Sequence, residues 1–589
     1  ERAARAQLLE ACPTLAGLEE DDTLVLPEPQ AALGLLAELR TLETPAAASP
    51  AAAGDPLPET AAASGATPAA AAPAVRVVWP HGESLRLRKV LHVRDLSLSL
   101  SGEGAWLQVG GSVAVDEQRV LALSALAAAA LQGRYVALGN GEYVQLDAAL
   151  RRRLADLGAL AESGRGAGLR LPVAGLPLVE EIAAEAGAVE AKAWWQQRAG
   201  RLAEARALQA PVPSTLQAQL RDYQIEGYRW LRRLAHWGAG ACLADDMGLG
   251  KTVQTLALLL ARAEGGPALV VAPTSVCANW IAEAAHFAPS LALHDYAGSG
   301  RAGRLDGLGA GDVLVCSWAL LARDAGALAA VSWHTAVLDE AQAMKNAQTQ
   351  RARAACALNA DFRVALSGTP VENHAGEIWS LMRFLNPGLL GSRERYAERY
   401  ANPIERSSDP EARARLRRLL APFLLRRLKS QVLDELPPRI EIVRSVELSD
   451  GERAFYEALR REALARASGD GGGENERRMR LFADLMRLRR ACCHPQLVVP
   501  DSDLPSSKLA AFGEIVGELR ENRHRALVFS QFVDHLAHVR AWLDAEGIRY
   551  CYLDGSTPAA ERSRQVAAFQ SGHGELFLIS LRAGGTGLN

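Results

Sequence analysis

The sequence lacks a large net charge, a long uncharged apolar run and paired cysteines, and each absence excludes a class of protein. Its formal net charge is −3, so any nucleic-acid surface must be a local patch and not a global basic field. It contains no run of about 18 uncharged apolar residues, so we expect no membrane span and no membrane partner. The eight cysteines form no C-x-x-C pair, and we interpret them as reduced core thiols without a metal site.

Composition along the chain divides its 589 residues into several parts. Residues 44–74 are rich in alanine and proline and cannot bury a core, so we predict a disordered linker after a helical segment at 1–43. Alternating patterns that follow predict strands, with a hairpin that turns at Gly139-Asn140-Gly141. Together with an alanine-rich, helical stretch at 150–210, they predict an accessory α/β domain and helical connector over 75–210.

Short apolar runs alternate with helical stretches from residue 215 onward, which indicates parallel sheets covered on both faces. The runs are ALVVAP (268–273), VLVCSW (313–318), TAVLDE (335–340) and FRVALSGTP (362–370), then ALVFSQ (526–531), RYCYLDG (549–555) and LFLISL (576–581). We therefore predict an α/β fold with a first lobe at 215–390, helical insertions or a brace at 391–505 and a second, incomplete lobe at 506–589. Ligands of such sheets bind at the carboxyl ends of the strands.

The stretch LADDMGLGKTVQT (243–255) has the end of a phosphate-binding loop but lacks its usual first glycine, because Asp245 stands there. The remaining glycines and the N-terminus of the following helix would direct N–H groups at phosphate oxygens. Lys251 would reach the β and γ phosphates, and the Thr252 hydroxyl would hold Mg²⁺. The loop therefore predicts a site for ATP with Mg²⁺.

The strand TAVLDE ends in two acids, Asp339 and Glu340. In P-loop enzymes an aspartate at such a strand end anchors Mg²⁺, and a neighbouring glutamate can act as a general base on the attacking water. A solvated strand end would be an ordinary interpretation of either acid alone. The order of loop, helix, strand and acid pair favours hydrolysis of ATP.

Ten motifs occur in order between residue 215 and residue 589. They are LRDYQIEGYRWL (220–231), LADDMGLGKTVQT (243–255), APTSVCANW (272–280), LDEAQAMKN (338–346), LSGTPVEN (366–373), PFLLRRLKSQVLDELPPR (422–439), LRRACCHP (488–495), LVFSQF (527–532), LDGST (553–557) and SLRAGGTGLN (580–589). This set resembles the Swi/Snf-type family of DNA-translocating ATPases, a helicase-like group of superfamily two that contains chromatin remodellers and bacterial polymerase-recycling enzymes. The resemblance implies two RecA-like lobes, and it explains Asp245, because D-E-M-G-L-G-K-T is the family's usual loop.

The resemblance also implies roles for individual residues. For ATP binding they are Gln224, Met247, Gly248, Leu249, Gly250, Lys251, Thr252, Gly584 and Gly585, with Gln224 at the position that reads adenine. Catalysis is implied for Lys251, Asp339, Glu340 and Gln342, metal binding for Thr252 and Asp339, and coupling of hydrolysis to movement for Ser367, Gly368 and Thr369. DNA contacts are implied for Pro273, Thr274, Ser275, Ser530, Gln531 and Arg582, although each also has an ordinary strand-end interpretation.

Two stretches are strongly basic, and they leave two interpretations open. They contain Arg413, Arg415, Arg417, Arg418, Arg426, Arg427 and Lys429, and then Arg477, Arg478, Arg480, Arg487, Arg489 and Arg490. Contacts to DNA phosphates would give affinity without sequence information and would depend on salt. A solvated helical face with acidic partners is the alternative.

The chain departs from the family pattern at its end, GGTGLN, where the family continues to an arginine pair in a D-R-x-x-R-x-G-Q pattern. An arginine finger contributes about 10³–10⁵ in rate. We therefore expect this chain to bind ATP but to be a weak or inactive hydrolase, compared with a protein extended at its C-terminus.

The resemblance implies a DNA-dependent ATPase that translocates along double-stranded DNA and remodels or displaces DNA-bound proteins, with RNA polymerase or nucleoid proteins as targets. We expect a monomer in the bacterial cytoplasm, associated with the nucleoid. Two alternatives stay open. One is a strand-separating DNA or RNA helicase, and the other is a nucleotide-gated scaffold that binds DNA without efficient turnover.

Overall fold

The computed structural model describes residues 29–43, 85–162, 168–368, 375–433, 440–467 and 474–584. The predictions for the linker at 44–74, for Thr369 and for Gly585 lie outside these residues. The chain forms two compact units. Unit 1 comprises Glu1–Val212, Ile225–Ala244 and Ala341–Arg426, and unit 2 comprises Pro213–Gln224, Asp245–Glu340 and Arg427–Asn589.

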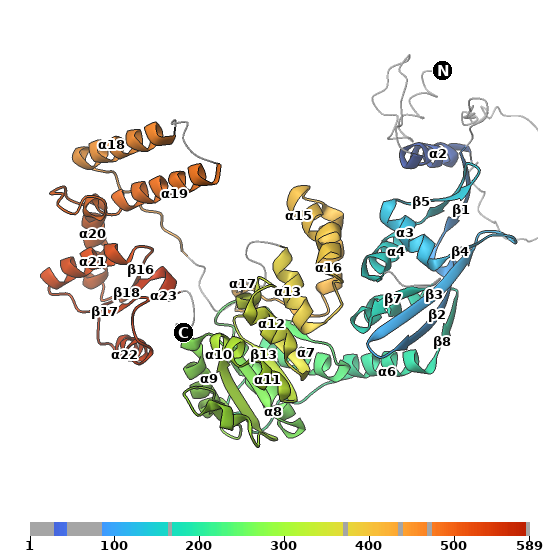
Figure 1. Ribbon diagram of the computed structural model, residues 1–589, viewed down its shortest axis with the longest axis horizontal. Helices are drawn as coiled ribbons and strands as arrows, with labels where there is room; N and C mark the ends of the chain where they lie inside the picture. Colours follow the sequence, from blue (N-terminus) through green and yellow to red (C-terminus); the bar gives the residue numbers. More distant parts are fainter. Residues whose placement is uncertain are drawn as a thin grey trace, which may run out of the picture. The chain divides into compact units, whose positions relative to one another are not determined.

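The accessory part of unit 1 contains two small sheets with helices packed against them (Figure 1). One sheet has the order β4-β3-β2-β8, with β7 paired to β3, and the other has the order β1-β6-β5. The elements are α2 (Pro29–Glu43), β1 (Arg86–Leu91), η2 (Val93–Asp95), β2 (Leu96–Glu103), β3 (Trp106–Ala114), β4 (Val120–Ala122), α3 (Leu123–Gln132), β5 (Tyr135–Gly139), β6 (Glu142–Leu146), α4 (Ala148–Leu160), β7 (Leu169–Pro172), η3 (Val173–Gly175), α5 (Leu176–Ala183), β8 (Ala188–Ala191) and α6 (Ala193–Ala207).

Sequence patterns explain most of these elements. In β2 the leucines are buried and the serines at 97 and 99 are exposed, which is the period of a sheet with one covered face. The predicted hairpin is confirmed, because β5 and β6 pair antiparallel around Asn140 and Gly141, whose φ angles are 51° and 73°. The prediction that 150–210 is helical is wrong at β7 and β8. These short strands add to β3 and β2 through long-range pairing that local propensity does not reveal.

Unit 1 also contains three parallel strands in the order β14-β9-β15. Its further elements are α7 (Asp222–Trp237), β9 (Ala241–Leu243), η6 (Ala341–Met344), α12 (Gln350–Ala357), β14 (Ala360–Leu366), α13 (Gly376–Leu385), α14 (Arg393–Tyr396), the π-helical turn η7 (Ala397–Ala401), α15 (Asn402–Arg406), α16 (Pro410–Leu420) and β15 (Leu424–Leu425). The side chains of β9 are fully buried, as expected for a parallel strand covered on both faces.

Unit 2 contains four parallel strands in the order β11-β12-β10-β13. Helices follow the strands in the alternation that the sequence predicts. The elements are α8 (Lys251–Arg262), η4 (Ala263–Gly265), β10 (Ala268–Ala272), α9 (Thr274–Phe287), β11 (Ala292–Asp295), η5 (Arg301–Leu305), β12 (Asp312–Ser317), α10 (Trp318–Arg323), α11 (Ala325–Ala330) and β13 (Trp333–Leu338).

The later residues of unit 2 form a second parallel sheet, with the order β16-β18-β17. The elements are α17 (Lys429–Val432), α18 (Asp450–Ala467), α19 (Glu474–Ala491), η8 (Pro495–Leu497), α20 (Ser507–Glu521), β16 (Ala526–Ser530), α21 (Val533–Ala545), β17 (Tyr550–Leu553), α22 (Ala559–Gln570), β18 (Leu576–Ser580) and α23 (Leu581–Gly584). The parallel strands form one series within residues 241–425 and a second within residues 526–580, each with intervening helices. These two series confirm the predicted α/β fold class. Among the described residues, no helix combines the length and the apolar character that crossing a membrane requires.

Candidate functional site

A cavity of about 700 Å³ in unit 2 lies at the carboxyl ends of the parallel strands. Its wall is formed by residues 218–224 at the start of α7, the loop before α8, one face of α9 along its length and the residues after β13. Of the predicted residues, the cavity is lined by Gln224, Met247, Gly248, Gly250, Lys251, Thr252, Asp339 and Glu340. It is also lined by Arg221, Val276, Asn279, Trp280, Glu283 and Phe287, which the sequence did not single out.

The loop before α8 depends on glycine at two positions. Gly248 and Gly250 have φ angles of 82° and 76°, in the left-handed region that side chains disfavour. A Cβ at Gly250 would also lie 2.4 Å from Nε2 of Gln224. Gln224 itself is held in place, because its Oε1 accepts from the Arg221 N–H at 2.9 Å and its Nε2 donates to the Leu249 carbonyl at 3.2 Å.

Lys251 begins α8 and folds over the loop. Its Nζ donates to the carbonyl oxygens of Asp245 at 2.7 Å and Asp246 at 3.3 Å. Burial lowers the pKa of Lys251, while the nearby carboxylates of Glu340 and Asp339 act in the opposite direction. Phosphate oxygens are charged acceptors and bind an ammonium group more strongly than neutral carbonyl oxygens do, so Lys251 is suited to exchange these acceptors for phosphate.

Asp339 is positioned by two tryptophans and a strand. Its N–H donates to the Val271 carbonyl of β10 at 2.7 Å, and its own carbonyl accepts from Trp318 Nε1 at 3.0 Å. The indole Nε1 of Trp280 donates to its Oδ2 at 2.8 Å. Burial raises the pKa of Asp339, and the Trp280 hydrogen bond opposes that shift. The carboxylate is therefore fixed in direction before any cation arrives.

Glu340 follows in an unusual backbone conformation. Its φ is 47°, which is costly for a residue with a side chain, and its N–H donates to Oδ1 of Asp339 at 2.9 Å. Such strain tends to be retained where the side chain has to be aimed. The turn presents the Glu340 carboxylate to the same cavity as Lys251.

Glu283 of α9 is the main acidic residue of the cavity that the sequence analysis missed. It is hydrogen-bonded to the Thr252 side chain and lies near Asp339, and burial raises its pKa. Helical spacing could have revealed it, since α9 begins within APTSVCANW and Glu283 lies one turn after Asn279 and Trp280 of that motif. The hydroxyl of Thr252 and the carboxylate of Asp339 are hard oxygen ligands of the type that Mg²⁺ takes, so the residues present fit the ion.

Asp245, the residue in place of the loop's first glycine, is completely buried. Its Oδ1 accepts from Nε of Arg427 at 2.9 Å and its Oδ2 from Nη2 of the same guanidinium. Arg427 Nη2 also donates to Oε1 of Gln254 at 3.0 Å. Arg427 therefore supplies the charge that a buried carboxylate needs, and Asp245 ties the loop to the chain after β15.

Among the described residues predicted for ATP binding, catalysis or coupling, five do not line the cavity: Leu249, Gln342, Ser367, Gly368 and Gly584. The side chain of Leu249 is fully buried, so this residue contributes only its carbonyl oxygen. Gln342 belongs to unit 1, where its Oε1 accepts from the Ser367 hydroxyl at 3.0 Å. A predicted catalytic residue and a predicted coupling residue are thus bonded directly to each other, and Gly368 follows them in the chain.

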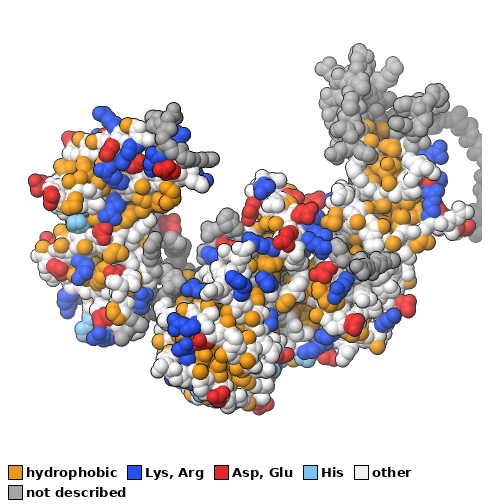
Figure 2. Space-filling model, in the orientation of Figure 1, with side chains coloured by type: hydrophobic (Ala, Val, Ile, Leu, Met, Phe, Trp, Pro, Cys, Tyr) orange, Lys and Arg blue, Asp and Glu red, His pale blue; other side chains and the backbone are white. Residues whose placement is uncertain are grey.

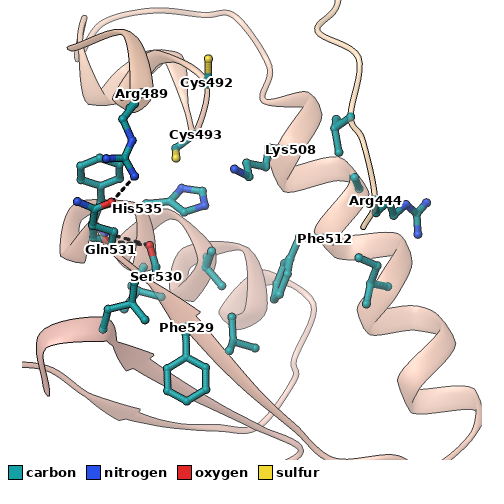
Figure 3. Close-up of a pocket in the computed structure, with 18 of the residues that line it drawn as sticks. Arg444, Arg489, Cys492, Cys493, Lys508, Phe512, Phe529, Ser530, Gln531 and His535 are labelled. Atoms are coloured by element: carbon teal, nitrogen blue, oxygen red, sulfur yellow. Dashed lines mark hydrogen bonds between the residues drawn. The ribbon is translucent and has the colours of Figure 1, made fainter. Parts of the chain in front are cut away.

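The predicted DNA contacts lie at three places in unit 2. Thr274 and Ser275 form the first turn of α9, and Pro273 immediately precedes it. Ser530 and Gln531 line a cavity of about 680 Å³ (Figure 3), where Gln531 accepts from Arg489. Arg582 lies in α23 together with Gly584.

Several arginines of the two basic stretches have acidic partners, which bears on whether these stretches contact DNA phosphates or form solvated helical faces. Arg415 and Arg418 face Asp156, Arg427 faces Asp245, and Arg487 and Arg490 face Glu462 and Asp534. The DNA interpretation is therefore wrong for Arg427, which is committed to a buried ion pair. Figure 2 shows basic and hydrophobic side chains interspersed over α18 and α19, where Met479 and Phe482 are exposed.

Comparisons with known proteins match two family models to the chain. The SNF2-related domain matches residues 223–497, and the helicase conserved C-terminal domain matches residues 507–589. The putative ATP-dependent helicase/translocase YwqA of Bacillus subtilis is 36% identical over 394 residues, which are 64% of this chain and 42% of that protein. The ISWI chromatin-remodeling complex ATPase CHR11 of Arabidopsis thaliana is 35% identical over 399 residues, or 64% of this chain and 37% of that protein.

A solved SWI2/SNF2 ATPase core of Sulfolobus solfataricus in complex with dsDNA is 33% identical, covers 63% of this chain and 80% of that chain, and has a TM-score of 0.39. The chain spans less than half the length of the two curated relatives. The two domain matches succeed each other in the order of the two series of parallel strands, which are the sheets of RecA-like lobes. The chain belongs to the SNF2-related family of helicase-like ATPases.

Proposed function

We propose that this protein is an ATP-dependent translocase on double-stranded DNA that remodels or displaces DNA-bound protein complexes. The observation that carries the proposal is the cavity on whose wall Lys251, Thr252, Asp339 and Glu340 meet. Within this family such a constellation is expected to couple ATP hydrolysis to movement of the two lobes along a duplex.

ATP with Mg²⁺ fits the chemistry of this cavity. Lys251 would exchange its two carbonyl acceptors for β and γ phosphate oxygens, and the N–H groups between Gly248 and Thr252 would bind the same phosphates. Mg²⁺, held by Thr252 and Asp339, would neutralise charge on the phosphates. The half-exposed Met247 and the amide of Gln224 lie on the same wall, where an adenine base would be bound.

Glu340 is the proposed general base, because its strained turn aims its carboxylate into the cavity. Gln342 and Ser367 are proposed to couple the state of the nucleotide to movement. The hydrogen bond between them would form or break as the nucleotide is hydrolysed, and this change would signal the state of the nucleotide to the rest of the protein.

DNA is proposed to contact the start of α9 at Pro273, Thr274 and Ser275, together with Ser530, Gln531 and Arg582. The short hydroxyls of Thr274, Ser275 and Ser530 suit phosphate oxygens, and such contacts carry no sequence information. A solved relative was determined with dsDNA, which supports duplex DNA as the track. The name of YwqA includes both helicase and translocase, so strand separation is the competing activity.

Two assays separate translocation from strand separation. A translocase displaces a third strand from a triplex while leaving the duplex intact, whereas a helicase releases one strand of a forked duplex. We expect ATP-dependent triplex displacement without duplex unwinding. Unwinding of the fork at the rate of triplex displacement would favour the helicase.

The third candidate is a nucleotide-gated scaffold that binds DNA without turnover. Lys251→Ala should abolish nucleotide binding, and Glu340→Gln should preserve binding while stopping hydrolysis. If both variants remodel DNA-bound protein as well as the unaltered protein does, the scaffold is correct and the motor is not.

RNA polymerase and nucleoid proteins are the proposed targets in a bacterial cytoplasm, and the protein is proposed to act as a monomer at the nucleoid. Affinity capture from the native host with the Glu340→Gln variant tests this. Enrichment of polymerase or nucleoid proteins that survives nuclease treatment is expected. Recovery of neither group would contradict it.

A further inference from the structure

A second cavity, of about 510 Å³, lies within unit 1. Helices α4 and α5 of the accessory part form one wall, and the segment from η7 through α16 to Phe423 forms the other. Apolar side chains such as Leu160, Leu178 and Phe423 cover part of the surface. None of the predicted ATP or coupling residues lines this cavity, and of the arginines considered as DNA contacts only Arg415 and Arg418 do.

Tyr400 is the feature of this cavity that indicates a ligand. The residue is 2% exposed, and its hydroxyl has no hydrogen-bond partner among the described residues. Burial raises the pKa of Tyr400 to about 12, so the group is a neutral phenol that can donate a hydrogen bond. A buried hydroxyl without a partner costs free energy that a bound acceptor would recover.

The backbone around Tyr400 is also unusual. Residues Ala397–Ala401 form a π-helical turn, and such turns occur often at functional sites. Arg399 of the same turn donates to the carbonyl of Ala159 in α4. The turn therefore holds Tyr400 against the accessory helices at the expense of regular helix geometry.

Positive charge predominates among the side chains that line the cavity. Four arginines line the cavity against two carboxylates; they are Arg152, Arg153, Arg415 and Arg418 against Asp156 and Glu181. Arg418 uses Nε and Nη2 on Asp156, at 3.1 and 2.9 Å, and Arg153 pairs with Glu185 outside the cavity wall.

The guanidinium group of Arg415 has N–H donors that are not hydrogen-bonded to Asp156. Its side chain is 15% exposed, and its Nε lies 3.6 Å from Oδ1 of Asp156, beyond hydrogen-bond distance. Arg415 is also the charged group with the largest effect on Tyr400. Arg152 at the rim is exposed and has no acidic partner among the described residues.

We propose that this cavity is a binding site for a small organic phosphate, with the phosphate on Tyr400 and Arg415 and an apolar body against Leu160, Leu178 and Phe423. A phosphate accepts several hydrogen bonds at once from guanidinium and phenol donors. Because the two walls come from the accessory part and from the helical segment before β15, the bound molecule stabilises their contact. The site is separate from the ATP cavity and does not depend on hydrolysis.

Phenyl phosphate is the probe, because it joins a phosphate to a small apolar body, and inorganic phosphate and benzyl alcohol represent its two halves. Isothermal titration of the full chain should show phenyl phosphate binding more tightly than either half. Tyr400→Phe should weaken binding by about tenfold, the usual effect of a hydrogen bond to a charged group. Arg415→Met should weaken it at least as much.

Arg413→Met is the matched control, since Arg413 is an exposed arginine of the same helix outside the cavity, and it should bind phenyl phosphate unchanged. Tyr400→Phe should keep the thermal stability of the protein, because it removes an unsatisfied group, so lost binding cannot come from unfolding. Lys251→Ala excludes the phosphate-binding loop and should also bind normally.

Three results would overturn the proposal. One is no binding of phenyl phosphate at millimolar concentration, and the second is equal binding by Tyr400→Phe and Arg413→Met. The third is binding that disappears in Lys251→Ala, which would assign the probe to the loop. Equal affinity for phenyl phosphate and inorganic phosphate would contradict the apolar part of the assignment.

Discussion

Arg427 and Asp245 form a buried ion pair that joins the phosphate-binding loop to the chain after β15, with Nε–Oδ1 at 2.9 Å. The two residues are far apart in sequence, and the position of Asp245 is glycine in other phosphate-binding loops. The backbone reinforces the pair, because the Asp246 N–H donates to the Arg427 carbonyl at 3.0 Å. The absent glycine is therefore replaced by a contact that only a carboxylate can make.

Loss of Arg427 should destabilise the fold strongly. Arg427→Met leaves the buried Asp245 carboxylate without a counter-charge, and breaking such a pair costs about 3–5 kcal/mol. The double variant with Asp245→Leu should recover most of this, since an apolar pair removes the unpaired charge. Arg426→Met, at the exposed neighbouring arginine, is the control. Urea unfolding measures each change, and equal stabilities of Arg427→Met and Arg426→Met would refute the role.

Trp280 should set the pH dependence of hydrolysis. Its hydrogen bond lowers the pKa of Asp339 against the larger effect of burial, which raises it. Trp280→Phe removes the donor, so the pKa of Asp339 rises further and the carboxylate is lost at a higher pH. The acidic limb of the ATPase pH profile should move upward. Trp333→Phe, which removes an indole bonded to Leu328 away from the site, should leave that limb in place.

The hydrogen bond between Ser367 and Gln342 should matter for coupling and not for nucleotide affinity. Neither residue lines the nucleotide cavity. Ser367→Ala should therefore bind a fluorescent ATP analogue with an affinity within about twofold of that of the unaltered protein, because the residues that contact the nucleotide are unchanged. The stimulation of ATPase activity by DNA should fall. A large loss of nucleotide affinity with normal stimulation would show the opposite division of roles.

The second lobe should lose stability in mild acid because of His535. Burial lowers the pKa of His535 to about 4, so the unfolded chain binds a proton at a higher pH than the folded one. Stability is present above the ordinary histidine pKa and falls as the pH drops from about 6.5 to about 4. Lys508, His494 and His538 face the same group and strengthen the effect. His535→Phe should flatten the pH dependence of unfolding, whereas the exposed His524→Ala should not.

The sequence predicted the sheets and most of the nucleotide cavity because both follow from local patterns. Apolar runs mark parallel strands, and the carboxyl ends of such strands meet at one edge, so Lys251 and Asp339 had to lie close together. Glycines at 248 and 250 were identified by the loop pattern, and their positive φ angles show why they are needed.

Contacts between distant segments could not be predicted in the same way. No periodicity connects Trp280 with Asp339 or Arg427 with Asp245, since both pairs depend on how strands and loops pack. For the same reason Arg415 and Arg418 were grouped with DNA contacts, whereas they face Asp156 of the accessory part. Charge in the sequence shows where cations are, and only the fold shows which of them are already paired.

We propose above all that hydrolysis at the cavity of Lys251, Asp339 and Glu340 drives movement along duplex DNA. Triplex displacement by the protein purified from its native host tests this most directly, with the Glu340→Gln variant as the partner that binds ATP without hydrolysing it. We expect ATP-dependent displacement by the unaltered protein and none by the variant, with equal binding of DNA by both. Displacement at the same rate by both proteins, or without ATP, would contradict it.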